Sequence, residues 1–159
     1  MQTFLTSASF EITASVLDTK RLGKQRLEAY QILKTLIAKR NNVKVSWENH
    51  PAVLMWAGHE EALLLYLSCI RKEWVKRGYT DNMQFEIDQL PIKHSDSPSI
   101  PSWVNDLRLH RNHKSRLLAK SPDWYIQWGW DVQPEANNLW PIMKNGDTWI
   151  YTNNGKRVV

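Results

Sequence analysis

The stretch from Asp18 to about Arg40 limits what this chain can fold into more than any other feature. Its apolar residues recur at the spacing of one helix face, and Asp18 is of a type that commonly caps a helix N-terminus. A segment with one apolar side along its whole length predicts a long helix that buries this side in a helical core. The predicted core face comprises Leu22, Ala29, Leu33, Leu36 and Ile37.

A polar stripe runs along the same predicted helix, beside its apolar face. At ~100° per residue, Arg21, Gln25 and Glu28 project together with Ile32, and Lys24 flanks them. Glu28 is the only carboxylate of this helix beyond its cap. Two interpretations follow: an ordinary ion pair between Glu28 and Lys24, or a carboxylate that stabilises a cationic sugar transition state or positions a water.

Two further residues of this helix need an explanation. Arg26 falls near the apolar face, so it has to be paired or to lie at the edge of that face. Gly23 lowers the stability of a helix by ~1 kcal/mol relative to alanine. It indicates either the close approach of another backbone or a substrate, or a glycine that is simply tolerated near a helix start.

The rest of the chain predicts further helices and a small β-structured tail. Helices are expected over residues 7–16, 51–57, 60–77, 102–120 and 122–129, with a long surface loop at 80–102. Residues 148–152 and 156–159 flank Asn-Asn-Gly and predict a small C-terminal β-hairpin. We therefore predict an all-α fold: a compact single-domain helical bundle over residues 1–159, with its helical core at about 7–129 and a tail at 130–159.

Cysteine usage and hydropathy bear on the compartment of the protein. The single cysteine, Cys69, excludes an internal disulfide framework and fits a reducing compartment. The N-terminus lacks the positive start and long apolar run of a signal peptide, and no apolar run approaches the ~20 residues of a membrane span. We expect a soluble, cytoplasmic monomer with no membrane association.

Positive charge is concentrated in two separate segments. Residues 18–40 carry seven cations and two anions, residues 107–120 carry five cations and no anion, and the formal net charge is +5. Two basic segments can converge into one phosphate-binding surface, or they can be two solvated helix faces. Among the nine tryptophans, most are expected in the core, and one or two could stack on or wedge between bases. The sequence does not indicate which.

Several common catalytic signatures are missing. There is no phosphate-binding glycine loop and no CxxC pair, and His110 and His113 lack acidic or cysteine partners nearby in the sequence. Cys69 lies in an apolar segment, which is typical of an inert core thiol. We therefore expect neither a metal site nor a cofactor.

Three stretches carry a resemblance to one known family. They are LDTKRLGKQRLEA at 17–29, NHPAVLMWAGH at 49–59 followed by KRGY at 76–79, and RLLAKSPDWY at 116–125. In order and spacing they resemble the pyrimidine-dimer DNA glycosylases, small all-helical base-excision enzymes first known from a phage endonuclease. The resemblance extends to a bacterial branch with the motifs LDxxRLGKQRxEA and NHPAVxMW, whose members need not share one substrate.

This resemblance implies a DNA glycosylase that acts on double-stranded DNA. In the family, the N-terminal amine attacks C1′ of the damaged nucleotide, the base leaves, an imine forms, and β-elimination can cut the strand. A helix glutamate, matched here by Glu28, supports opening of the sugar ring, and a base is extruded from the duplex. The phosphate contacts implied for this chain are Arg21, Lys24, Arg26, Lys114, Arg116 and Lys120.

Gln2 departs from the pattern of the family. The dimer enzymes expose the amine of a small residue once methionine is removed, whereas Gln2 disfavours this removal and leaves the amine on Met1. In one mechanism the catalytic residues are then Glu28 and Met1. In the other, that of a monofunctional glycosylase, Glu28 activates a water together with Gln25 or His113. Activity as an AP lyase, which would cut the strand at the abasic site, is left open.

Polar side chains are expected to surround the extruded base. Asn49 and His50 lie at a predicted helix start, where they could hydrogen-bond the base or simply cap the helix. The whole predicted base pocket comprises Gln2, Asn49, His50, His59 and His113.

Together these features predict a DNA glycosylase that excises a damaged or modified pyrimidine and leaves an abasic site. The base is a UV pyrimidine dimer, in base-excision repair, or a phage-type modified base such as glucosylated hydroxymethylcytosine, in anti-phage defence. The departure at Gln2 and the branch motifs favour the modified base. The alternative function is a non-catalytic DNA-binding module that senses distorted duplex.

Overall fold

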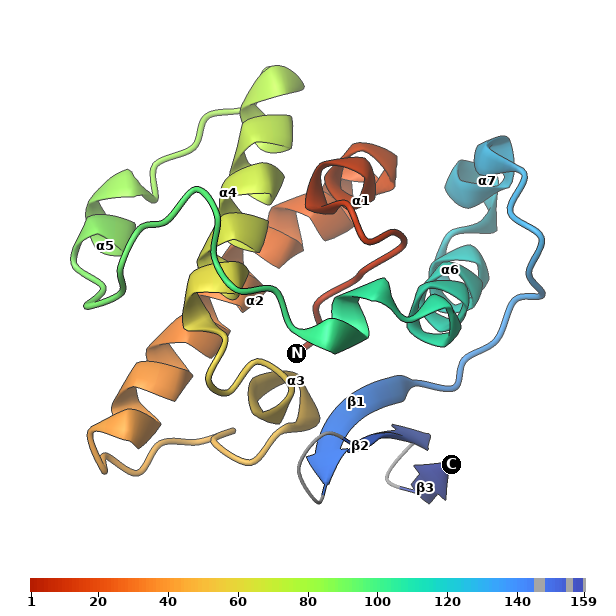
Figure 1. Ribbon diagram of the computed structural model, residues 1–159. Coiled ribbons are helices and arrows are strands. Elements are labelled where there is room, and N and C mark those ends of the chain that lie inside the picture. The colour runs from red at the N-terminus through yellow and green to blue at the C-terminus, as the bar shows by residue number, and fades with distance from the viewer. Residues whose placement is uncertain (145–147, 154–155, 159) are drawn as a thin grey trace.

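The computed structural model describes residues 1–144, 148–153 and 156–158, and it is mostly helical, as predicted (Figure 1). The helices are α1 (Phe10–Val16), α2 (Thr19–Arg40), α3 (Pro51–Leu54), α4 (Glu60–Lys76), α5 (Gln84–Asp88), α6 (Leu107–Lys120) and α7 (Pro122–Tyr125), with short 3₁₀ helices η1 (Ser102–Asn105) and η2 (Ile126–Trp128). The strands are β1 (Leu139–Lys144), β2 (Thr148–Asn153) and β3 (Lys156–Val158). No helix in the described ranges is long and apolar enough to cross a membrane.

Helix α2 forms where the sequence predicts it and packs along α4, while α1 packs on α4 (Figure 1). Asp18 caps α2 by accepting a hydrogen bond from the backbone N–H of Arg21, as predicted. The predicted core face is buried except for Ile37, which is only partly buried. Ile32, predicted on the polar stripe, is fully buried, because α3 and α4 together cover more of α2 than an amphipathic pattern indicates.

Gly23 is a point of close approach, but the neighbour is a side chain. A Cβ built on Gly23 would lie 3.1 and 3.2 Å from two ring carbons of Trp74. The Trp74 ring is held in place, because it stacks on Tyr79 with centroids 4.3 Å apart and lies 4.4 Å beneath the guanidinium of Arg26. Arg26 also forms an ion pair of 2.7 Å with Asp81, which confirms the prediction that Arg26 is paired.

Replacement of Gly23 by alanine is expected to destabilise the fold. Alanine favours the helix by ~1 kcal/mol, but forcing a methyl against a fixed ring costs ~1–3 kcal/mol. We expect a net loss of about 1 kcal/mol, seen as a fall in Tm of ~2–4 °C. In a Trp74→Leu background, the same change should raise the Tm, and an equal effect of Gly23→Ala in both backgrounds would contradict the close contact.

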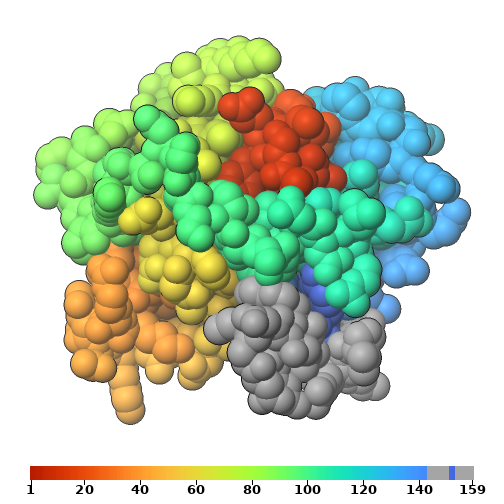
Figure 2. Space-filling model, in the orientation of Figure 1, coloured from red at the N-terminus to blue at the C-terminus, as the bar shows by residue number. Residues whose placement is uncertain are grey.

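The first six residues run as an extended segment through the interior. Residues 2–6 are buried, and Figure 1 shows the chain starting near the centre of the molecule and passing between α2 and α6 to reach α1. On the face shown in Figure 2, residues from η1 to α6 cover the centre of the molecule next to α1. The indole N–H of Trp56 donates to the Thr3 hydroxyl (3.0 Å), and the Tyr66 hydroxyl donates to the Phe4 carbonyl (2.9 Å). These contacts fix the backbone of the segment against the core.

Several predicted segments differ from the structure in detail. The helix predicted at 51–57 ends at Leu54, and the helix predicted at 122–129 is divided into α7 and η2. The loop predicted at 80–102 contains the short helix α5, in which Ile87 is buried against the core. The single helix predicted at 102–120 is divided into η1 and α6 at Asp106, whose extended backbone (ψ 115°) ends η1 and whose carboxylate caps α6 through the Arg108 N–H. The hydrogen-bonded Arg108 side chain lowers the pKa of Asp106 to about 2.

The tail forms a three-stranded antiparallel sheet in the order β1-β2-β3. Strands β2 and β3 are the predicted hairpin, although its turn at 154–155 lies outside the described residues. The sequence prediction missed β1, which pairs with β2 from Leu139 opposite Asn153 to Lys144 opposite Thr148. β1 packs on α3 and α6 and buries Trp140. Trp140 lines the same cavity as the polar stripe of α2, so the tail helps to form this cavity.

Candidate functional site

A cavity of about 500 Å³ lies where the start of the chain, α2, α6 and β1 meet. Its size is within the ~300–1,000 Å³ that small-molecule sites occupy. The cavity combines one carboxylate, several cations and few apolar side chains. The residues that line it are Met1, Gln2, Phe4, Lys20, Arg21, Lys24, Gln25, Glu28, His50, Arg116, Lys120, Asn138 and Trp140.

Among the described residues, Glu28 is the only acidic one in the lining of this cavity. One of its carboxylate oxygens, Oε2, accepts hydrogen bonds from the backbone N–H of Gln2 (3.1 Å) and from Nε2 of Gln25 (3.2 Å). The predicted ion pair with Lys24 is not among the ion pairs of the described part of the chain. Glu28 is therefore held by neutral donors, with part of its carboxylate left to face the cavity.

Gln25 joins the polar stripe to the N-terminal segment. Its side chain is 1% exposed. Its Oε1 accepts hydrogen bonds from the Phe4 N–H (3.1 Å) and the Tyr66 hydroxyl (2.7 Å), and its Nε2 donates to the Gln2 carbonyl (2.9 Å) as well as to Glu28. Because every polar group of this amide is paired, Gln25 is a positioning residue for Glu28 and for the start of the chain.

The side chain of Gln2 reaches α6. Its Oε1 accepts hydrogen bonds from Nη1 of Arg116 (3.0 Å) and from Nδ2 of Asn138 (2.9 Å). The nitrogen that contacts Glu28 is the backbone nitrogen of Gln2, and this nitrogen forms the peptide bond with Met1. Two polar atoms of cavity-lining residues, Nε of Arg116 and Oδ1 of Asn138, are buried and have no hydrogen-bond partner among the described residues.

Several cations line the cavity, and they lie close to one another. Lys120 has its pKa lowered by burial and by the positive charges of Arg116, Arg21 and Lys24. Arg21 is partly neutralised, because its Nη1 lies 3.1 Å from Asp18 and donates to Ser121 (2.8 Å). A group of crowded cations with little compensating acid favours the binding of an anion such as a phosphate.

His113 lies behind the cavity and does not line it. Its ring is fully buried, Nδ1 accepts a hydrogen bond from the Leu5 N–H (2.8 Å), and Nε2 lies 3.2 Å from the side-chain nitrogen of Gln2. Burial, with smaller contributions from the charges of Arg116 and His110, lowers the pKa of His113 to about 3. His113 therefore stays neutral and holds the N-terminal segment in place.

His113 is expected to make the protein less stable in acid. The unfolded chain takes up this proton near pH 6.5, but the folded chain only near pH 3, so the free energy of unfolding falls as the pH drops from about 6.5 towards 3. Asparagine can still accept from Leu5, so His113→Asn should lower the Tm at pH 7 and flatten its decline in this interval. Thermal unfolding between pH 7 and 3.5 tests this, with the exposed His94→Asn as the control. An undiminished decline in the His113 variant would contradict the assignment.

The structure separates several predicted site residues from this cavity. Arg26 is paired with Asp81 and lies over the Trp74 ring, and Lys114 lies 5.7 Å from the ring centre of Trp130. Asn49 and His59 line other surface depressions, whereas His50 lines the cavity and also caps α3 by accepting from the Ala52 N–H. The predicted residues that the structure brings together are Met1, Gln2, Arg21, Lys24, Gln25, Glu28, His50, Arg116 and Lys120.

Four lining residues were missed by the sequence analysis. Lys20 belongs to the basic segment that was counted but was not singled out, and Phe4 lies in an N-terminal stretch with no periodic pattern. Asn138 and Trp140 come from the tail, which no local pattern connects to α2. The described residues contain no cluster of three or more potential metal-ligating side chains.

A family model described as pyrimidine dimer DNA glycosylase matches residues 1–87, more than half of the chain. The matched range contains Glu28, Gln25 and the first two of the three stretches that carry the resemblance. No curated protein matches the chain significantly, and neither does any solved structure.

Proposed function

This chain belongs to the pyrimidine dimer DNA glycosylase family, and we propose that it extrudes a damaged or modified pyrimidine from duplex DNA and excises the base, leaving an abasic site. The observation that carries this proposal is the Glu28 carboxylate in a cavity otherwise lined by cations and neutral groups. Release of a base builds positive charge on the sugar, which a fixed carboxylate stabilises where water is largely excluded.

The cations of the cavity would hold the DNA backbone around the extruded nucleotide. Lys20, Lys24 and Lys120 are exposed and can each donate to a phosphate oxygen, and the partly buried Arg116 adds positive charge to the wall of the cavity. Such contacts position the duplex without reading its sequence. Arg26 and Lys114 are not part of this proposal, because their side chains are engaged elsewhere.

The nucleophile follows from the atom that contacts Glu28. With Met1 in place, the Gln2 nitrogen is an amide, whose lone pair is delocalised and does not attack a sugar carbon. We therefore propose that Glu28 activates a water and that the enzyme is monofunctional. Removal of Met1 would expose an amine at this position and permit an imine. Borohydride reduction on abasic DNA tests for an imine, because a monofunctional enzyme gives no covalent adduct. An adduct would place the imine on the Met1 amine, which also lines the cavity, or on an exposed Gln2 amine, and mass spectrometry of the intact protein shows which of the two is present.

The proposal is tested by incubating the protein with three duplexes. One carries UV pyrimidine dimers, one carries glucosylated hydroxymethylcytosine, and one is unmodified. We expect abasic sites in one of the first two and none in the third. Dimer excision would indicate repair, and excision of the glucosylated base would indicate a role in defence against phage DNA. Binding to all three without any abasic site would overturn the proposal.

A further inference from the structure

Trp47 is exposed to solvent in the loop between α2 and α3. Its side chain is 62% exposed, more than that of any other tryptophan whose side chain the structure describes. Water contact with so large an apolar ring is unfavourable, and no role in the core offsets it. The exposed ring therefore needs an explanation outside the fold of this chain.

The backbone of Trp47 is also unfavourable for its residue type. Its φ is +72°, in the left-handed region that bulky side chains rarely adopt. The loop is held in this conformation by the His50 N–H, which donates to the Trp47 carbonyl (2.9 Å), and by Lys39, whose ammonium donates to the Glu48 carbonyl (3.3 Å). Strain that is maintained by the surrounding structure is common at functional positions.

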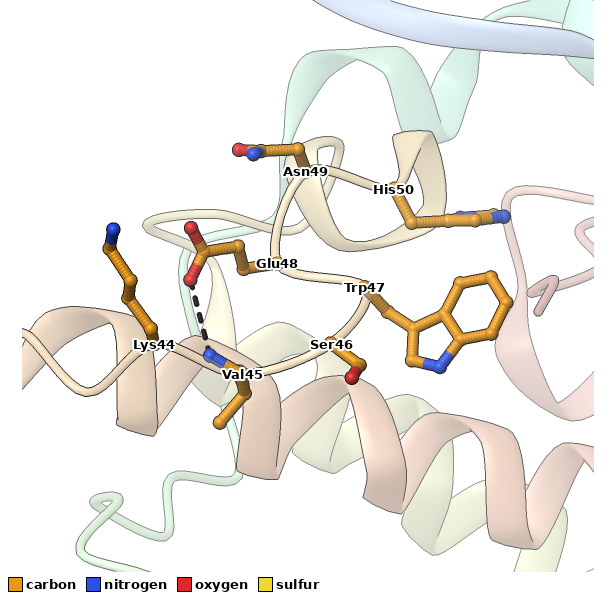
Figure 3. A pocket seen from close by; sticks show the side chains of 7 residues that line it. All are labelled: Lys44, Val45, Ser46, Trp47, Glu48, Asn49 and His50. Carbon is orange, nitrogen blue, oxygen red and sulfur yellow. Dashed lines mark hydrogen bonds between the residues drawn. The ribbon is translucent and has the colours of Figure 1, made fainter.

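A row of aromatic rings connects Trp47 to the cavity. The Trp47 and His50 rings meet edge to face with centroids 6.0 Å apart, and His50 meets Trp140 in the same way at 5.6 Å. Both His50 and Trp140 line the cavity around Glu28. Figure 3 shows that Trp47 and His50 point in the same direction from the loop, whereas Lys44 and Asn49 point the other way.

We propose that Trp47 stacks on a base of the bound duplex next to the nucleotide that is extruded into the cavity. The proposal rests on the proposed function, because it needs an extruded nucleotide. Extrusion interrupts the stack of bases and leaves a base face uncovered, and an aromatic wedge from the protein can cover this face and hold the duplex kinked. The position of Trp47, one ring away from the cavity, matches this task.

The other exposed aromatic residues do not share this position. Trp124 is anchored to the fold, since its indole N–H donates to the Val16 carbonyl (2.9 Å). Neither Trp128 nor Phe85 lines the cavity or contacts a ring that does. Phe85 is 72% exposed on α5 and therefore provides a matched control.

The test uses a duplex with a tetrahydrofuran abasic analogue and 2-aminopurine in the adjacent position. Trp47→Asn removes the ring and supplies a residue that adopts positive φ readily, so it adds no backbone strain. We expect this variant to lose ~5- to 150-fold in affinity for the analogue duplex relative to an intact duplex, the range that base–aromatic stacking gives. The quenching of 2-aminopurine on binding should be lost with it. Trp47→Tyr should retain both properties, and Phe85→Asn should match the parent protein.

Two results would overturn the proposal. One is a Trp47→Asn variant that folds with the parent Tm and keeps both the preference for the analogue and the quenching. The other is a Phe85→Asn variant with the same losses as Trp47→Asn, because the effect would then not be specific to this ring. Base release by the parent protein reports on the proposed function separately. If bases are released while Trp47→Asn binds like the parent, only the stacking role fails.

Discussion

Replacement of Glu28 by glutamine is expected to reduce the rate of base release by at least about 100-fold while DNA binding persists. Glutamine keeps an oxygen that can accept from the Gln2 N–H and the Gln25 amide, so the local structure should survive. What is lost is the negative charge that opposes the cationic sugar and the basic group that activates water. Binding should be equal or tighter, because an anion beside the phosphates is removed.

Single-turnover release of the base, measured together with binding of the same duplex, tests this expectation. Glu11→Gln is the matched control, since Glu11 is exposed in the first turn of α1 and is not in the lining of the cavity. The alternative function, a non-catalytic sensor of distorted duplex, predicts that Glu28→Gln changes nothing. A variant that releases the base at the parent rate would therefore favour the sensor and remove Glu28 from the mechanism.

The long helix and its stripe could be predicted because both depend on local rules. The capping residue Asp18 and the spacing of the apolar residues fix where α2 lies and which side is buried, and the structure follows them. The pairing of Arg26 followed from the cost of burying a charge without a partner. Its partner Asp81 did not, because it lies 55 positions along the chain, in a segment without periodicity.

The composition of the candidate site could be predicted only in part. Arg21, Lys24, Gln25 and Glu28 share one helix, so their proximity is a matter of helical geometry. The burial of residues 2–6 has no local signal, since the polar groups of this segment are satisfied by side chains from distant elements. The same distance in sequence explains why the tail, which brings Trp140 beside His50, was not connected to the site.

Gln25→Leu is expected to have the largest effect on stability among the residues of the site. Leucine fills a similar volume but leaves the Phe4 N–H and the Gln2 carbonyl without their partner. A buried polar group left unpaired costs ~1–3 kcal/mol, so the loss should be about 2–5 kcal/mol, a large part of the ~5–15 kcal/mol that stabilises a typical domain. The fall in Tm should be at least about 5 °C.

The variant should also lose base release, because the N-terminal segment would no longer be fixed to α2 and the Gln2 N–H would move away from Glu28. Tyr66→Phe separates this positioning effect from a general loss of stability. The Tyr66 hydroxyl lies within hydrogen-bond distance of the Phe4 carbonyl and of Gln25 Oε1, which share its single proton, but it does not touch Glu28 or Gln2. Its removal leaves one buried group, the Phe4 carbonyl, without this partner, so it should cost ~1–3 kcal/mol and leave most of the base release. If both variants lose activity in proportion to their Tm, Gln25 acts through stability alone; a much larger loss in Gln25→Leu, assayed well below its Tm, assigns Gln25 the positioning of the carboxylate.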